Sequence, residues 1–280
     1  MKILYFKDTG EYKPGIYTDE GIIPVSQINK EQYAHTPLTL EDIEHFEGLE
    51  ERKNEVHLLK EEDLEIGPCV KNPSKIICVG LNYQRHAMES NMEPPKLPVL
   101  FNKFNNTLVE YQGNVSLGKE GEEFDYEVEL GVVIGKTCKD VSVEEALDYV
   151  LGYCTANDLS CRDLQFKTPQ WLLGKSLDKF LPLGKYLVTK DEIEDCQKLK
   201  LSCYLNGELR QNSNTADMIF SVAEIISFIS RHMTLEPGDL ILTGTPEGVI
   251  MGMDEKNWLK PGDVVRVEIE KLGSTTNKMV

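Results

Sequence analysis

An acidic pair at the head of an apolar segment is the feature of this 280-residue chain that most constrains its fold. Glu127 and Glu129 are separated by one residue, and the sequence then continues as Leu-Gly-Val-Val-Ile over 130–134. Such an apolar run predicts a strand over 127–134 that enters a hydrophobic core. Because side chains alternate along a strand, both carboxylates point to the same face. That face must either meet water or supply positive partners for two buried carboxylates.

A third carboxylate, Asp158, stands at the end of a second predicted strand, over 152–158. Three carboxylates that converge on one point suit a hard divalent cation such as Mg2+, which prefers oxygen ligands and keeps several waters. The alternative is a solvated sheet face. The Glu-x-Glu spacing taken alone favours this alternative by roughly three to one, because polar residues commonly face outward in antiparallel sheets. The choice therefore depends on the rest of the chain.

Charge and composition restrict the class of partner. The chain has 30 basic and 47 acidic residues, a net charge of −17 and a pI near 4.8, so nucleic acid and anionic membranes are not expected as partners. We find no segment typical of a signal peptide or a membrane span. The seven cysteines include no Cys-x-x-Cys pair, which predicts buried, reduced thiols in a cytoplasmic protein.

Residues 1–70 are predicted to form a small α+β domain of their own. Thr39 and Asp42 have the spacing of a helix capping box, so a helix is expected to begin there. The strongly charged stretch 41–65 predicts a solvated helix face or loop. The sequence Ile-Gly-Pro-Cys at 66–69 marks the boundary. Short apolar runs bounded by Gly and Asp turns predict strands at 2–6, 15–18 and 21–25.

Residues 71–280 are predicted to form a larger, β-rich domain with few helices. Ser142 is expected to cap a helix over 142–150, with Gly152 as its stop signal. Ser221 and Glu224 have the capping-box spacing for another helix, up to about residue 232. Strand and turn signals dominate, which favours an α+β fold over a doubly wound sheet. The predicted strands are 76–79, 127–134, 152–158, 240–243 and 264–270.

Two further segments carry groups that could take part in catalysis. His86 and Glu89 are three residues apart, so on a helical turn the carboxylate would orient the imidazole as a general base; an exposed pair without a role is the alternative. Lys175 follows a glycine as in a phosphate-binding loop, but the rest of that motif is missing. It is expected either to stabilise a developing oxyanion or to be an ordinary surface lysine.

The sequence around each of the other polar groups, taken alone, does not decide whether that group has a functional role. Arg162 and Gln165 follow Asp158 by four and seven residues, a helical spacing that predicts one shared face. Lys103 could supply another positive group. The segment 243–249 is rich in small residues and predicts either a ligand-binding loop or a tight turn after a strand.

Together these segments resemble the fumarylacetoacetate hydrolase family over roughly residues 73–270. Each motif is weak alone, but their number and order make chance agreement improbable. The compact layout is similar to the bacterial isomerase/decarboxylase and acylpyruvate hydrolase members. The matching segments are 79–89 with His86 and Glu89, Asp-Tyr-Glu-Val-Glu-Leu-Gly at 125–131, Asn157-Asp158 with 162–165, Gly-Lys-Ser-Leu-Asp at 174–178, 214–220 and 242–246.

The resemblance implies a β-rich, mixed β-sandwich roll that binds Mg2+ (or Mn2+), and commonly a homodimer. By the same resemblance the metal ligands are Glu127, Glu129 and Asp158, and the small substrate is an anionic 2-oxo acid or 2-hydroxy-dienoate of aromatic-compound catabolism. Its reaction passes through a metal-stabilised enolate: acylpyruvate-type C–C hydrolysis, 2-oxo diacid decarboxylation or 2-hydroxyhepta-2,4-diene-1,7-dioate isomerisation. The implied catalytic residues are His86, Glu89 and Lys175, and the implied substrate-binding residues are Lys103, Arg162, Gln165 and Thr245.

Other functions remain open at this point, among them a structural β-rich protein with acidic surfaces, which would bind no metal. Two more keep a ligand. One is a lyase of the ureidoglycolate type, which the motifs do not separate from the reactions above. The other is a non-catalytic metal- or metabolite-binding protein on the same scaffold, against which the intact His86, Glu89 and Lys175 argue.

Overall fold

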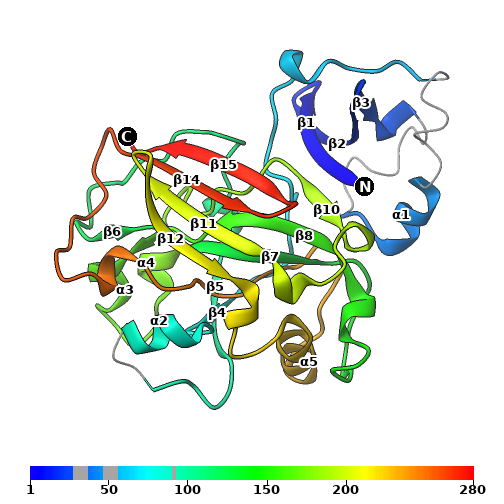
Figure 1. Ribbon diagram of the computed structural model, residues 1–280. Helices are drawn as coiled ribbons and strands as arrows, with labels where there is room; N and C mark the ends of the chain where they lie inside the picture. Colours follow the sequence, from blue (N-terminus) through cyan, green and yellow to red (C-terminus); the bar gives the residue numbers. More distant parts are fainter. Residues whose placement is uncertain (28–36, 47–55, 90–92) are drawn as a thin grey trace.

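The computed structural model describes residues 1–27, 37–46, 56–89 and 93–280 (Figure 1). Within these residues the framework is a mixed nine-stranded sheet that packs against an antiparallel four-stranded sheet. In spatial order the large sheet contains β3 (Gly21–Pro24), β2 (Glu11–Thr18), β1 (Lys2–Asp8), β10 (Leu187–Thr189), β8 (Val150–Asn157), β7 (Val128–Ile134), β13 (Leu240–Leu242), β4 (Ile76–Gly80) and β5 (Val99–Lys103). The small sheet contains β12 (Glu208–Asn214), β11 (Lys200–Leu205), β14 (Val264–Ile269) and β15 (Gly273–Lys278).

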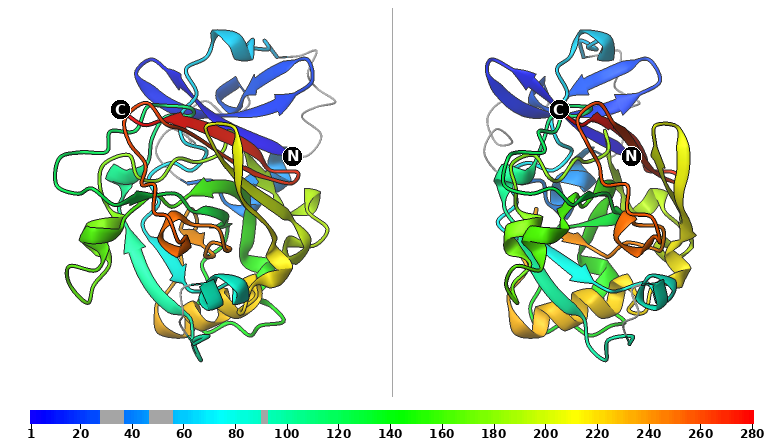
Figure 2. Two further views of the ribbon diagram at one scale, coloured as in Figure 1. Left: turned by 60° about the vertical axis from the view of Figure 1, so that its left-hand side comes forward. Right: turned by 90° about the vertical axis from the view of Figure 1, so that its left-hand side faces the viewer.

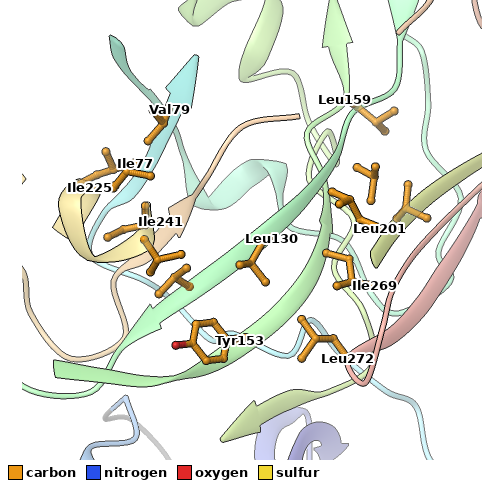
Figure 3. Close-up of a cluster of buried hydrophobic side chains, with 14 of the residues drawn as sticks. Ile77, Val79, Leu130, Tyr153, Leu159, Leu201, Ile225, Ile241, Ile269 and Leu272 are labelled. Carbon is orange, nitrogen blue, oxygen red and sulfur yellow. The ribbon is translucent and has the colours of Figure 1, made fainter. Parts of the chain in front are cut away.

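The central strands β7 and β8 are buried along their whole length. Val132 packs into the core between the two sheets, whereas its neighbour Val133 packs into a second core on the opposite face. A strand covered on both faces needs apolar residues at successive positions, which accounts for the uninterrupted run in the sequence. Figure 3 shows the first core, where Leu130 of β7 lies near Leu201 and Ile269 of the small sheet. Each such side chain contributes about 1.5–3 kcal/mol on full burial.

Helix α5 (Val222–His232) closes one side of this core. Ser221 and Glu224 form the complete capping box, with each side chain bonded to the backbone of the other residue. Ile225 and Ile229 lie on the buried face, and Ile225 approaches Ile77 and Ile241 in Figure 3. The sequence prediction of a helix up to residue 232 is confirmed.

The first strands extend the large sheet, because β1 pairs antiparallel with β10. Ile3 and Ile16 share a core with Leu183 and Leu187 of the larger part of the chain. Thr39 and Asp42 exchange hydrogen bonds at the start of α1 (Leu40–Phe46), as predicted. The strands predicted in this part are confirmed as β1, β2 and β3. The boundary at residue 70 stays a prediction, and 47–55 of the predicted charged stretch lie outside the described residues.

One predicted element is wrong. Ser142 and Glu145 do exchange hydrogen bonds, but a short 3-10 helix over Ala146–Tyr149 follows, and Val150 already begins β8. The strand predicted over 152–158 is confirmed as β8, but its pairing with β7 extends it back to Val150 and so ends the predicted helix there. Gly152 is not a stop signal: a Cβ there would lie 2.3 Å from the carbonyl oxygen of Val188, so the glycine allows two strands to approach closely.

The β-rich α+β fold class is confirmed. No described helix is long and apolar enough to cross a membrane. Figures 1 and 2 show α2 (Gln84–Glu89), α3 (Arg162–Gln165), α4 (Leu172–Lys175) and the loop after β13 gathered on the side of the molecule away from β1–β3.

Candidate active site

The three predicted carboxylates meet where β7 and β8 lie side by side. Glu127 immediately precedes β7, Glu129 belongs to it, and Asp158 immediately follows β8. The backbone N–H of Asp158 donates to the carbonyl oxygen of Glu127 at 2.9 Å, which fixes the two strand ends together. All three side chains are buried, and one oxygen from each lies within 4.8 Å of the others. The solvated-face alternative is therefore wrong.

Three buried cations surround two of these carboxylates. Lys103 Nζ lies 2.6 Å from Asp158, and Lys175 Nζ lies 2.7 Å from Glu127 and 2.9 Å from Asp158. Arg162 Nη2 lies 2.7 Å from the other oxygen of Glu127. Burial opposes ionisation of Glu127, but Lys175 and Arg162 outweigh it and lower its pKa to about 2. Burial likewise disfavours the charged form of Lys175, yet Asp158 and Glu127 raise its pKa.

Glu129 has a different environment. The interaction described for its carboxylate is one hydrogen bond from the backbone N–H of Gly244, at 2.8 Å. Burial and the negative charges of Asp158 and Glu127 raise its pKa well above the usual value. A divalent cation among the three oxygens would remove this penalty, since it favours the charged form of every ligand. The all-oxygen donor set and the charge of Glu129 thus fit Mg2+ or Mn2+.

His86 and Glu89 lie on α2, as their spacing predicts, and His86 lines the same cavity as Glu127 and Glu129. His86 Nδ1 is 3.4 Å from Glu89 Oε2, a long hydrogen bond. Glu89 also accepts from the backbone N–H of Gly248, at 3.0 and 3.2 Å. The loop after β13 therefore fixes the carboxylate that orients the imidazole.

Asp125 is a buried member of the site to which the sequence analysis gave no role. It belongs to the short strand β6 (Phe124–Asp125), which pairs with β9 (Ser160–Cys161). Its carboxylate accepts five hydrogen bonds: two from Arg162, and one each from the backbone N–H groups of Tyr126, Ile250 and Met251. It thus connects the guanidinium beside Glu127 with the loop that contacts Glu89. Its place in the 125–131 motif is the one signal that could have drawn attention to it.

The other predicted residues also reach the site, with two corrections. Arg162 and Gln165 lie on α3 and are bonded to each other, but Asp158 precedes that helix and shares no helical face with them. Lys175 is neither exposed nor in a loop, because it ends α4 and is buried. Gly174 before it is required by close packing, since a Cβ there would lie 2.3 Å from the carbonyl oxygen of Cys161.

Thr245 lines the cavity, but its hydroxyl already has partners. The hydroxyl donates to the carbonyl oxygen of Val128 at 3.0 Å and accepts from Gln211 at 2.9 Å. The loop 243–249 therefore reaches the cavity wall through Thr245, whose hydroxyl fixes it to β7 and β12. Substrate binding by Thr245 stays a prediction, as do the roles of the other site residues.

Aromatic side chains form one wall of the site, a feature that the sequence analysis missed. Phe101, Phe166 and Trp171 line the cavity together with Glu127 and Glu129, and the cavity has a volume of about 30 Å3. That is room for roughly two water molecules, since one needs about 10–15 Å3. The three rings come from β5 and from the segments around α3 and α4, so sequence separation concealed their proximity.

The site thus combines a buried carboxylate cluster, its paired cations and a histidine on a β-rich α+β scaffold. The family model described as "Fumarylacetoacetate (FAA) hydrolase C-terminal" matches residues 75–280. The chain belongs to the fumarylacetoacetate hydrolase family of enzymes, which confirms the resemblance seen in its motifs.

Individual relatives differ in reaction. The chain is 46% identical over 226 residues to a mitochondrial oxaloacetate tautomerase of Xenopus laevis, covering 80% of this chain and 71% of that protein. It is also similar to the 5-carboxymethyl-2-hydroxymuconate delta-isomerase of Mycobacterium smegmatis, with 29% identity, TM-score 0.79 and coverage of 100% and 99%. A maleylpyruvate hydrolase from Sphingobium sp. SYK-6, solved with manganese(II) and pyruvate, gives 25% identity, TM-score 0.80 and coverage of 100% and 99%.

Proposed function

We propose that this protein is a divalent-metal-dependent enzyme that converts a 2-oxo acid through its enolate, with keto–enol tautomerisation of oxaloacetate as the reaction to test first. The observation that carries the proposal is one cavity lined by His86, Glu127, Glu129, Arg162 and Lys175, with the buried Asp158 and Lys103 in direct contact with this cluster. The relatives named as oxaloacetate tautomerases support the choice of substrate.

Charge balance favours an anionic substrate. The buried acidic groups Asp125, Glu127, Glu129 and Asp158 contribute −4 and Lys103, Lys175 and Arg162 contribute +3, a sum of −1. Glu127, Glu129 and Asp158 would hold the metal, which would bring the sum to +1. When bound, Mg2+ or Mn2+ supplies Lewis acidity for the keto oxygen of a 2-oxo acid.

The protein's own groups account for proton transfer and charge stabilisation. His86, oriented by Glu89, is the group on the cavity wall that can take a proton from the carbon next to the keto group and return one to it. The Lys175 ammonium lies between Glu127 and Asp158, where it would stabilise the negative charge of an enolate oxygen. Tautomerisation needs no further reactant, because the proton lost from carbon is regained at oxygen.

The same enolate would serve the other reactions predicted from the sequence. If His86 instead deprotonates a water, C–C hydrolysis of an acylpyruvate follows, and loss of carbon dioxide from a 2-oxo diacid or isomerisation of a dienoate also passes through an enolate. The hydrolase and isomerase relatives support these as second candidates. A cytoplasmic homodimer that acts in aromatic-compound catabolism remains part of the proposal.

The test is turnover of a panel: enolised oxaloacetate, acetylpyruvate, fumarylpyruvate and a 2-hydroxy-dienedioate. Each is measured with Mg2+, with Mn2+, with EDTA, and with Glu127→Ala and His86→Ala protein. We expect metal-dependent loss of the ultraviolet absorbance of the oxaloacetate enol, abolished in Glu127→Ala and slowed by about 10²–10⁴-fold in His86→Ala. Turnover that survives EDTA or is unchanged in His86→Ala would contradict the proposal.

A further inference from the structure

Trp171 is packed against the backbone at the end of β4, next to the catalytic segment. Gly80 is the last residue of β4, and a Cβ built there would lie 2.4 and 2.8 Å from Cζ3 and Cη2 of the Trp171 ring. The backbone of Gly80 does not have the positive φ that demands glycine. The glycine is therefore needed for room: it lets the indole lie directly on the strand.

The indole is braced by two other rings. Its centroid lies 5.2 Å from that of Phe101 and 6.5 Å from that of Phe166, both edge-on, with interplanar angles of 61° and 75°. The Lys175 ammonium lies 5.0 Å from the Phe101 ring centroid, a cation–π contact. The backbone N–H of Lys175 also donates to the backbone carbonyl oxygen of Trp171, one helical turn earlier, at 3.2 Å. The wall is thus fixed to the lysine that contacts Glu127 and Asp158.

The wall formed by Phe101, Phe166 and Trp171 is aromatic and carries no charge. The three cations of the site are already paired with Asp125, Glu127 and Asp158. Phe101, Phe166 and Trp171 line the cavity beside Glu127 and Glu129, so a substrate that extends from these carboxylates toward the wall meets the three rings. Trp171 packs on both Gly80 and Phe101 and so has little freedom to move aside for a larger ligand, whereas Phe166 is half exposed.

We propose that Trp171, seated on Gly80, limits the chain length of the substrate, so that the site selects short 2-oxo acids over longer acylpyruvates and dienedioates. The inference rests on the proposed function, because it assumes that the 2-oxo acid group binds at the carboxylate cluster.

The experiment measures binding of a chain-length series to the Mg2+-loaded protein by calorimetry, with oxalate as the short reference and 2-oxoglutarate and 2-oxoadipate as longer members. Wild-type protein is expected to prefer oxalate to 2-oxoadipate. In Trp171→Leu the ratio of the two dissociation constants should fall by about tenfold, the effect of one or two methylene groups in a tight pocket. Oxalate affinity itself should change little.

Glycine variants provide the controls. Gly80→Ala displaces the indole and is expected to alter the ratio, whereas Gly80→Ala combined with Trp171→Leu should behave like Trp171→Leu alone. Gly67→Ala imposes the same kind of clash elsewhere, since its Cβ would lie 2.5 Å from Cδ1 of Tyr12. It should lower the melting temperature without altering the ratio.

A ratio that stays within about twofold of wild type in folded Trp171→Leu would overturn the inference. So would wild-type protein that binds 2-oxoadipate as tightly as oxalate. Failure of every ligand to bind with Mg2+ would remove both this inference and the proposed function. If oxalate binds and the ratio shifts as expected, but oxaloacetate is not turned over in the same samples, the proposed reaction alone fails.

Discussion

At the scale of single residues, Asp125 holds two parts of the site together. Asp125→Asn removes the charge that pairs with Arg162 and weakens the hold on the loop at Ile250 and Met251. Loss of one partner from a buried ion pair costs about 3–5 kcal/mol of unfolding free energy. We also expect at least about tenfold lower kcat/KM and weaker Mn2+ binding, measured by calorimetry and by denaturant titration.

Asp239→Asn is the matched control for that variant. Asp239 is as buried as Asp125 and accepts hydrogen bonds from Ser74, Lys75 and Glu236. It immediately precedes β13, whereas the loop that contacts the site follows β13. Asp239→Asn should lower the free energy of unfolding by a comparable amount and leave the Mn2+ affinity of the protein unchanged. Equal effects of both variants on Mn2+ binding would reduce Asp125 to a general structural role.

Removal of the Glu129 charge is predicted to have opposite effects on the stability of the metal-free protein and on metal binding. Burial and the neighbouring negative charges of Asp158 and Glu127 raise the pKa of its carboxyl group, so the charged form destabilises the metal-free protein. Glu129→Gln should therefore leave the metal-free melting temperature unchanged or raise it. The rise on adding Mg2+, equivalent to about 2.7 kcal/mol at one hundred times the dissociation constant, should disappear. A metal-free variant that melts well below wild type would contradict this account.

At the scale of elements, the loop after β13 is predicted to position the acid–base pair. Gly248 has φ +96°, and a Cβ there would lie 2.2 Å from the carbonyl oxygen of Arg210. Gly248→Ala should displace the N–H that holds Glu89 and lower kcat more than it raises KM. Gly262→Ala is the control, because φ is +100° but no atom lies within 4 Å of its Cβ. It should cost only about 1–2 kcal/mol of stability and leave kcat unchanged.

Elements with strong local signals were predictable and elements fixed by tertiary contacts were not. The capping box at Ser221 and the apolar run of β7 placed α5 and the central strand correctly. The helix predicted over 142–150 failed: β8, predicted to start at 152, begins at Val150, where it already pairs with β7, and 146–149 form only a 3-10 helix. The carboxylates could be grouped from strand alternation, whereas the aromatic wall joins Phe101 and Trp171 from distant segments and could not be foreseen.

At the scale of the complete protein, the first strands extend the large sheet, and the separate domain predicted for residues 1–70 stays a prediction. β1 covers the edge of β10, with Ile3 opposite Leu187. Ile3, Ile16 and Ile23 are buried in the core that also contains Leu183. A chain that begins at residue 71 would expose this edge and this core to water.

We therefore expect the fragment 71–280 to be insoluble or to unfold well below the full chain. Burial of each isoleucine contributes about 1.5–3 kcal/mol, so three of them approach the total stability of an ordinary domain. Ile3→Ala in the full chain gives the graded comparison, with an expected loss of about 2–5 kcal/mol in denaturant titration. A soluble fragment that melts near the full chain and binds Mn2+ with the same affinity would show that residues 71–280 fold on their own, because neither the β10 edge nor the shared core would then need the first strands.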